Sequence, residues 1–278
     1  MPELPEVETV ARGLDESLSG RTITDVDVYW ERSIGAPNPA TFADRLVGQT
    51  ITDVRRRGKW IVIKLESGDA LLVHLRMTGQ LLVEAAGTSD GDYTRVAVRL
   101  DNGNRLRFSD MRKFGRLVLT EDAGEVLGDL GPEPLGEDFT VERFRRMLAQ
   151  RRGRIKSLLL NQRFLAGLGN IYVNEALWQA RIHPLRAANS LSSVEVERLY
   201  GTIRSVLRAA IEAGGTTLDN GNFKKADGES GAFVSQLQVY DREGELCDCC
   251  EAPIERITVG QRGTYFCPCC QEAEPRDR

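Results

Sequence analysis

The spacing of apolar residues changes twice along this chain. From Pro5 onward the first apolar residues recur at helical spacing, which predicts an N-terminal helix with Val7, Val10, Ala11 and Leu14 on one face. Residues 21–120 instead form short alternating runs separated by turn residues such as Asn102-Gly103, a pattern typical of antiparallel strands. Beyond residue 140 the helical spacing returns. We therefore expect an α+β fold with a strand-rich first half built as an antiparallel sandwich or barrel.

Turn-forming residues mark where one part of the chain ends and the next begins. The stretch GPEPLGEDF at 131–139 is rich in proline, glycine and acidic residues, which indicates a hinge or linker. Residues 216–235 are rich in glycine, asparagine, aspartate and lysine, which favours a mobile loop. We expect three domains: a strand-rich domain at 1–132, a helical domain at 133–238 that contains this loop, and a cysteine-bearing domain at 239–278.

Composition excludes some classes of protein. The chain has 278 residues, of which 41% are hydrophobic and 28% charged, as in an ordinary globular protein. Its apolar runs all fall short of the roughly 18 residues that cross a bilayer. The acidic start lacks the basic and apolar regions of a signal peptide. We therefore expect a cytoplasmic protein with no membrane partner.

The distribution of charge changes the picture that the total gives. A net charge of −4 argues mildly against a polyanionic partner. Residues 141–186, however, contain ten basic and two acidic residues, a local net charge of +8. Because the local field decides whether phosphates are attracted, this stretch is compatible with nucleic-acid binding. A solvated helix face with no partner is the alternative reading of the same charges.

The cysteines indicate a metal site. All six lie between residues 247 and 270, where two Cys-x-x-Cys pairs are separated by sixteen residues. Each pair wraps one corner of a tetrahedral site, and four protein ligands leave no position open for catalysis. Cys249 and Cys269 allow a shifted register, but only the outer members of each cluster have the x-x spacing. We expect one structural Zn²⁺ bound by Cys247, Cys250, Cys267 and Cys270.

A zinc ribbon, a basic helical region and a strand-rich domain together indicate a DNA-binding protein. A set of longer motifs goes further and spans residues 1–271: MPELPEVETV, RRRGKW, HLRMTG, DMRKFG, LGPEPL, LAGLGNIYVNEALW, GGTTL, LQVYDREGELC and GQRGTYFCPCC. In this order and spacing they closely resemble the bacterial formamidopyrimidine-DNA glycosylase family. The resemblance implies an N-terminal β-sandwich, a helical domain with a helix–two-turns–helix element, and a zinc ribbon. It also implies a monomer that binds damaged double-stranded DNA and is associated with the nucleoid.

The resemblance implies a DNA glycosylase that is also an AP lyase. Its nucleophile is the amine of Pro2, released when Met1 is removed, and an α-amine titrates near pH 8, so part of it is neutral at pH 7. Attack on the sugar forms an N-terminal Schiff base, which then undergoes β,δ-elimination. By resemblance, Glu3 is the acid/base that assists base loss. Lys59 corresponds to the donor for β-elimination, and Arg262 to the donor for δ-elimination.

The resemblance also assigns residues that open and hold the duplex. Met77 fills the space left by the extruded base, Arg112 hydrogen-bonds the widowed cytosine and Phe114 is a wedge between base pairs. Further DNA contacts fall on His74, Arg152, Lys156, Asn170 and Tyr240. For His74, a purely structural histidine remains the alternative.

Lesion preference is the property on which the family's pattern is least complete here. The loop at 216–235 and the PELPEVET opening favour oxidised purines (8-oxoguanine and formamidopyrimidines). Tyr93 occupies the position of a DNA-contacting histidine, and Ala232 replaces an aromatic residue of the loop. Two alternatives remain: an oxidised-pyrimidine glycosylase of the endonuclease VIII type, and a non-catalytic damage-binding protein. We expect the latter to have lost Pro2 or Glu3, and both are present.

Overall fold

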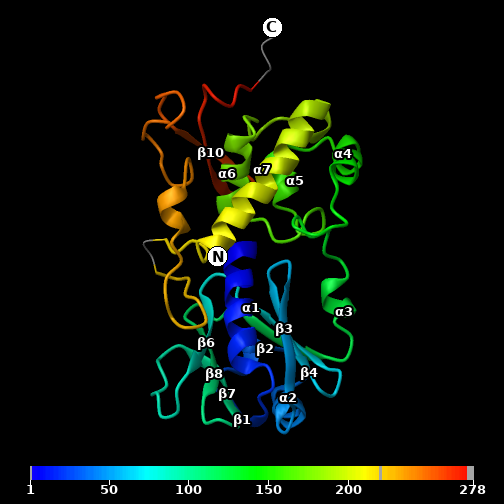
Figure 1. Ribbon diagram of the computed structural model, residues 1–278, viewed down its shortest axis with the longest axis vertical. Coiled ribbons are helices and arrows are strands. Elements are labelled where there is room, and N and C mark those ends of the chain that lie inside the picture. The colour runs from blue at the N-terminus through cyan, green and yellow to red at the C-terminus, as the bar shows by residue number, and fades with distance from the viewer. Residues whose placement is uncertain (1, 219–220, 274–278) are drawn as a thin grey trace. The chain divides into compact units, whose positions relative to one another are not determined.

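The computed structural model describes residues 2–218 and 221–273, which form two compact units (Figure 1). The first unit comprises Met1–Asp129 together with Ala210–Val234, and the second comprises Leu130–Ala209 together with Ser235–Arg278. Met1, residues 219–220 and residues 274–278 lie outside the described residues. The expected α+β class is confirmed, with sheets in the first unit and helices and a cysteine-bearing hairpin in the second.

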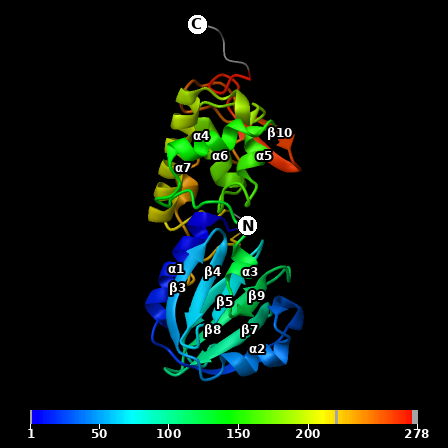
Figure 2. The same cartoon turned by 90° about the vertical axis from the view of Figure 1, so that its right-hand side faces the viewer.

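Two sheets form the first unit, as the alternating pattern predicted. One has the order β1-β7-β8-β6, and the other has the order β2-β9-β5-β4-β3. Figure 2 shows β3, β4, β5 and β9 side by side in the second of these sheets. Their bounds are β1(Ile23–Val28), β2(Ile34–Ala36), β3(Ile51–Arg57), β4(Trp60–Leu65), β5(Ala70–His74), β6(Gly79–Glu84), β7(Thr94–Leu100), β8(Arg105–Asp110) and β9(Arg116–Thr120).

The pairing within these sheets departs from the expected pattern at one point. The short strand β2 pairs in parallel with β9, whereas the other described pairs are antiparallel. The helix α2(Pro39–Leu46) was also missed. The sequence nevertheless contains a helix-start signal here, an N-cap asparagine, Asn38, followed by Pro39 at the first helical position. In the structure the Asn38 side chain accepts from the backbone N–H of Thr41 at 3.0 Å.

Helix α1(Leu4–Leu18) packs against strands of both sheets, namely β3 and β4 of one and β6 of the other. Its apolar face is buried, as the spacing predicted, because residues three and four apart share one side of a helix. The core of the unit is shared by the helix and the two sheets and includes Val10, Leu14, Ile63, Val73, Val98 and Phe108. This packing fixes the N-terminal end of the chain on the sandwich.

Residues 210–234 belong to this first unit rather than to the helical one. Phe223 and Ala226 lie in the same core, and the carbonyl of Ala226 accepts from the Val83 N–H at 3.1 Å. Gly13 of α1 permits this approach, because a Cβ there would lie 3.1 Å from the Cβ of Ala226. The helical domain expected at 133–238 includes this segment, whereas its packing places residues 210–234 in the first unit.

Helices and a hairpin make up the second unit. Its main helices are α4(Val141–Ala149), α5(Ile155–Leu159), α6(Asn170–Gln179) and most of α7(Ser193–Glu212), and the antiparallel hairpin consists of β10(Glu255–Val259) and β11(Arg262–Phe266). The hairpin packs on α6, and Trp178 lies against a cluster of Val239, Cys247, Ile254 and Cys267. Within the described residues, no helix is both long and apolar enough to span a membrane.

Candidate active site and nucleic-acid interface

Pro2 and Glu3 lie at the start of α1 and are buried. Glu3 is the N-cap residue, and it forms a capping box with Glu6, whose Oε2 accepts from the Glu3 backbone N–H at 2.8 Å. The capping box sets the direction in which the chain enters the helix. The two residues expected to start the chemistry are thus held by the first turn of α1.

Glu6 is a residue of this site that sequence reasoning missed. Its side chain is 2% exposed, and its second oxygen, Oε1, accepts from the backbone N–H of Thr216 at 2.8 Å. One carboxylate therefore joins Glu3 to the first residue of the 216–235 loop. The spacing Glu3-x-x-Glu6 is a capping-box signal that was available. The bond to Thr216 spans 210 positions, and no local pattern indicates it.

Lys59 lies in the turn between β3 and β4 and is buried. Arg56 supports this turn, since its Nη1 donates to the carbonyl of Gly58 at 3.1 Å. The Nε of Arg56 also pairs with Oε2 of Glu8 on α1 at 2.9 Å. Burial acts against ionisation of Glu8, but the hydrogen bond and charge of Arg56 outweigh it and lower the pKa of Glu8. An ion pair thus ties the Lys59 turn to the helix that begins at Glu3.

His74 ends β5 and pairs in register with Trp60, the residue after Lys59. Its pKa is lowered to about 3, first by burial and then by the charges of Arg76 and Lys59. The ring is therefore neutral at pH 7. Its Nδ1 accepts from the Arg76 backbone N–H at 3.0 Å, so the remaining proton lies on Nε2. His74 thus offers one N–H donor of the kind that a phosphate oxygen accepts.

The three expected duplex-opening residues are exposed on loops of the first unit. Met77 is 38% exposed between β5 and β6, and Phe114 is 49% exposed between β8 and β9. The guanidinium of Arg112 lies 4.9 Å from the centre of the Phe114 ring. The exposed side chains of Met77 and Phe114 leave apolar surface in contact with water. Insertion into a partner would bury that surface, so their exposure is compatible with such a role.

A buried aspartate joins these two loops, and the sequence reasoning missed it. Asp110 is fully buried, and its Oδ1 accepts from the Thr78 hydroxyl at 2.5 Å, next to Met77. Its Oδ2 accepts from the Gly115 N–H at 2.7 Å, next to Phe114. Asp110 is the first letter of the DMRKFG motif, so the signal was present, but burial of its charge was not visible.

Tyr93 lies next to Asp110. Its side chain is 47% exposed, and its carbonyl accepts from the Asp110 backbone N–H at 2.9 Å. The guanidinium of Arg95 lies 5.9 Å from its ring centre. The phenol therefore shares a surface region with a cation. Ala232, the substituted position of the loop, is also exposed.

The second unit carries the other expected DNA contacts. Asn170 is the first residue of α6, and its Nδ2 donates to the carbonyl of Gly263 at 2.9 Å. Arg262 begins β11 and is exposed, as is Arg152 in the loop before α5. Tyr240 is half-buried, and its ring makes an edge contact with Tyr265 at 5.3 Å between centroids. These four lie near or on the surface.

Lys156 is placed differently from the phosphate contact expected of it. Its side chain is 0% exposed, and its ammonium donates to Asn174 Oδ1 at 2.9 Å, Gly263 O at 3.1 Å and Thr264 Oγ1 at 2.7 Å. In this arrangement the ammonium faces the interior of the unit. Contact with a phosphate would require it to leave these three acceptors, at a cost typical of unmade buried hydrogen bonds.

The four expected metal ligands lie together. The sulfur atoms of Cys247, Cys250, Cys267 and Cys270 all lie within 4.8 Å of one another. Three of the separations are 3.9, 3.3 and 3.5 Å, close to the roughly 3.8 Å between thiolates of a tetrahedral zinc site. Cys249 and Cys269 are exposed and lie outside the group. The donor set therefore fits one zinc ion with no open position.

Comparison with family models covers most of the chain. Residues 1–117 match the formamidopyrimidine-DNA glycosylase N-terminal domain, and residues 130–221 match the formamidopyrimidine-DNA glycosylase H2TH domain. Residues 244–273 match a zinc finger found in FPG and IleRS.

Whole proteins and solved structures agree with these matches. The chain is 48% identical to a formamidopyrimidine-DNA glycosylase of Herpetosiphon aurantiacus, over 98% of this chain and 100% of that protein. It superposes on the crystal structure of MutM (FPG) from Thermus thermophilus with a TM-score of 0.89 and 41% identity, covering 99% and 100% of the two chains. A Lactococcus lactis FPG mutant in complex with Fapy-dG-containing DNA gives a TM-score of 0.91 and 36% identity, covering 98% and 100%.

Proposed function

This chain belongs to the formamidopyrimidine-DNA glycosylase family, and we propose that it excises oxidised purines from duplex DNA and then cleaves the strand as an AP lyase. The observation that carries the proposal is the buried Pro2–Glu3 segment at the start of α1, which Glu6 joins to the root of the 216–235 loop. Two of the curated relatives that it matches are both named formamidopyrimidine-DNA glycosylase, and two similar Lactococcus lactis structures are complexes with DNA that contains Fapy-dG or an abasic site.

Base loss begins at the N-terminal amine. The lone pair of the Pro2 nitrogen attacks C1′ of the damaged nucleotide, and the bond from C1′ to the purine breaks with its electrons leaving on the base. The nitrogen gives up its N–H proton as it bonds to C1′, and the departing base takes up one proton, so the step balances. Glu3 supplies a proton to the sugar oxygen as the ring opens, which leaves an iminium between Pro2 and C1′. Because the proline amine is secondary, the iminium carries a fixed positive charge and withdraws electrons from C2′.

Strand cleavage follows from that charge. Loss of a C2′ proton allows the 3′ phosphate to leave by β-elimination, with Lys59 as the proton donor at this step. A second, δ-elimination then expels the 5′ phosphate, with Arg262 binding that phosphate. The Arg56–Glu8 pair, which fixes the Lys59 turn to α1, supports a shared site for the first two steps.

The exposed loop residues open the duplex. Met77 fills the space of the extruded base, while Arg112 pairs with the orphaned cytosine and Phe114 wedges between base pairs. Neutral His74 donates Nε2–H to a backbone phosphate, and Tyr93 adds its hydroxyl near the same loops. Phosphates on the second unit are bound by Arg152, Asn170 and Tyr240.

Zinc has a structural role in this proposal. Cys247, Cys250, Cys267 and Cys270 would hold one ion, and bound zinc supplies a rigid crosslink under the hairpin that bears Arg262. We also propose that the protein acts as a monomer in the bacterial cytoplasm, associated with the nucleoid through DNA. The three domains expected from the sequence remain our proposal for the functional division of the chain.

Competition between lesions tests the substrate class. Zinc-loaded protein with Pro2 at its N-terminus is given equal amounts of two labelled duplexes, one with 8-oxoguanine opposite cytosine and one with thymine glycol opposite adenine. We expect the 8-oxoguanine strand to be cut first. Preferential cutting of thymine glycol would favour the endonuclease VIII type, a result to which the loss of an aromatic at Ala232 would contribute. Tight binding without cutting of either would favour a non-catalytic protein.

A further inference from the structure

Lys156 is a buried cation that the proposed mechanism does not use. Its ammonium lies between α5, which carries it, and the start of β11, where it binds Gly263 O and Thr264 Oγ1. The third acceptor, Asn174 Oδ1, belongs to α6. One side chain therefore links three elements of the second unit, and its position is fixed by all three.

The two acceptors on β11 directly follow Arg262 in the chain. The carbonyl of Gly263 receives a second donor from Asn170 Nδ2 at 2.9 Å. The turn before Arg262 is tight, with positive φ values at Gly260 and Gln261. The backbone at Arg262 is therefore held by the hairpin on one side and by the buried ammonium and the Asn170 amide on the other.

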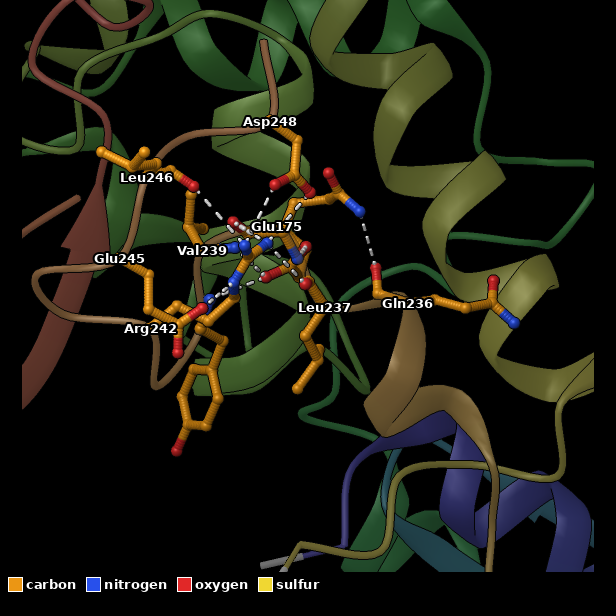
Figure 3. Close-up of polar contacts among 10 residues, drawn as sticks. Glu175, Gln236, Leu237, Val239, Arg242, Glu245, Leu246 and Asp248 are labelled. Atoms are coloured by element: carbon orange, nitrogen blue, oxygen red, sulfur yellow. Dashed lines mark hydrogen bonds and ion pairs between the residues drawn. The ribbon is translucent and has the colours of Figure 1, made fainter. Parts of the chain in front are cut away.

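The second unit has another buried charged residue, Glu175 on α6, which binds the backbone of residues 238–240. The Glu175 carboxylate is 1% exposed and accepts three consecutive backbone N–H groups, from Gln238 at 2.9 Å, Val239 at 3.0 Å and Tyr240 at 2.9 Å (Figure 3). Three donors to one carboxylate define the path of the chain at Tyr240.

Arg242 closes the same segment from the other side. Its Nη1 donates to the carbonyls of Leu237 and Gln238 at 3.1 and 3.0 Å, and its guanidinium pairs with Glu245 and Asp248 (Figure 3). Three N–H groups and two carbonyls of residues 237–240 are therefore bound by the Glu175 carboxylate and the Arg242 guanidinium. Such a network is costly to disturb at one member, because the remaining groups stay buried and unpaired.

We propose that Lys156 and Glu175 are positioning residues with separate tasks, Lys156 orienting Arg262 for the δ-elimination and Glu175 orienting Tyr240 for DNA binding. The inference rests on the proposed function, because it assigns those tasks to Arg262 and Tyr240. The edge contact between Tyr240 and Tyr265 connects the two segments, so each variant has its main effect on its own readout and a smaller one on the other.

Lys156→Met and Glu175→Gln separate the two tasks. On duplex containing an abasic site, Lys156→Met lowers the ratio of δ- to β-elimination product by roughly tenfold to a hundredfold, because small displacements of a catalytic group cost about that much. Base excision and affinity change little. Glu175→Gln raises the dissociation constant for lesion-bearing duplex by about tenfold, the effect of one charge-assisted hydrogen bond. Its product ratio stays near that of wild type.

Controls separate positioning from loss of structure. Lys64→Met and Glu142→Gln make the same chemical changes at exposed positions and leave both readouts unchanged. Zinc content of every variant is measured, because a lost ion would move both readouts together. Thr264→Val removes one acceptor of the Lys156 ammonium and lowers the product ratio to a smaller extent. It serves as the test should Lys156→Met fail to fold.

An Arg262→Ala background completes the test. If Lys156 acts through Arg262, adding Lys156→Met to Arg262→Ala produces no further fall in the product ratio. The proposal is overturned if the two changes multiply, or if Lys156→Met leaves the ratio unchanged while it weakens binding and reduces the salt dependence as a lost phosphate contact does. Wild type that neither excises nor cleaves overturns the proposed function itself, whereas an active wild type with unaltered variants overturns only this inference.

Discussion

Two buried carboxylates, Glu6 in the first unit and Glu175 in the second, each bind the backbone of a distant segment, but they connect different parts of the protein. Both are at most 2% exposed, and both accept backbone N–H groups from segments distant in the sequence. Glu6 divides its two oxygens between its own helix cap and the 216–235 loop. Glu175 gives both to one continuous segment.

The difference concerns what each carboxylate connects. Glu6 joins the residue proposed as the acid/base to the loop proposed to recognise the lesion, so it connects chemistry with recognition. Glu175 fixes the path of a segment that presents a proposed phosphate contact. Burial raises the pKa of Glu175 despite three N–H donors, which shows how much desolvation such an anchor bears. Changes at the two positions should therefore have different functional signatures.

Removal of zinc should cause the largest loss of stability, and this loss should be confined to the second unit, which contains Glu175. Binding of a structural zinc ion contributes roughly 10–16 kcal/mol in small zinc fingers, so chelation should unfold the hairpin that packs on α6. We expect amide protons of β10 and β11 to lose protection while those of β4 and β5 keep theirs. Cys249→Ser, outside the ligand group, should retain the ion. Equal loss of protection in both places would contradict this division.

Glu6→Gln should have the next largest effect. The amide keeps one acceptor and turns an NH₂ group toward the other N–H, so one buried backbone donor is left unpaired at a cost of about 1–3 kcal/mol. Excision of 8-oxoguanine should fall by on the order of ten- to a hundredfold, with affinity for DNA little changed. Single-turnover excision and binding titrations measure the two. Glu16→Gln, exposed on the same helix, is the matched control, and a pure loss of affinity would remove the distinction from Glu175.

Acidification should destabilise the first unit through His74. Because its pKa falls from an ordinary 6.5 to about 3 in the folded chain, the unfolded chain binds the proton first. Its contribution to stability is therefore complete above pH 6.5 and is lost as the pH falls toward 3. Replacement by glutamine should remove roughly 2–3 kcal/mol of the stability change between pH 7 and pH 4.

Denaturant titrations of wild type and His74→Gln across this range measure the effect of His74. The pKa of His183, the other histidine, is also lowered, first by burial. His183→Gln should therefore flatten the pH dependence in the same direction in the second unit. Parallel curves for wild type and His74→Gln would show that His74 titrates normally in the folded chain.

Asn38→Ala should have the smallest effect and calibrates the others. Asn38 caps α2, a helix to which no function is assigned here. Loss of such a cap costs about 1 kcal/mol. Thermal unfolding should report this loss, while excision, affinity and product ratio stay at wild-type values. A fall in excision here would mean that general stability, rather than the Glu6 contacts, controls activity.

Helices, strands and the metal site could be predicted from the sequence, because they follow from residues close together in the chain. Contacts of buried polar side chains with distant residues could not be predicted in this way. The strands around Asn102-Gly103, the face of α1 and the cysteine cluster all follow from short-range patterns. Glu6, Asp110 and Glu175 each also bind a group far along the chain, at Thr216, Thr78 and residues 238–240 respectively, and no local pattern indicates these contacts. The phosphate contact expected of Lys156 rests on its position ahead of the LAGLGNIYVNEALW motif, and only the fold shows that its ammonium is bound inside the second unit.

Borohydride trapping tests the central claim, that the amine of Pro2 is the nucleophile. Protein beginning at Pro2 is mixed with duplex containing 8-oxoguanine opposite cytosine, reduced, digested and analysed for the modified peptide. We expect one covalent adduct on the N-terminal proline, and none from protein that retains Met1, whose Pro2 nitrogen is an amide. An adduct on a lysine such as Lys59, or an equal yield from the Met1-bearing form, would contradict it.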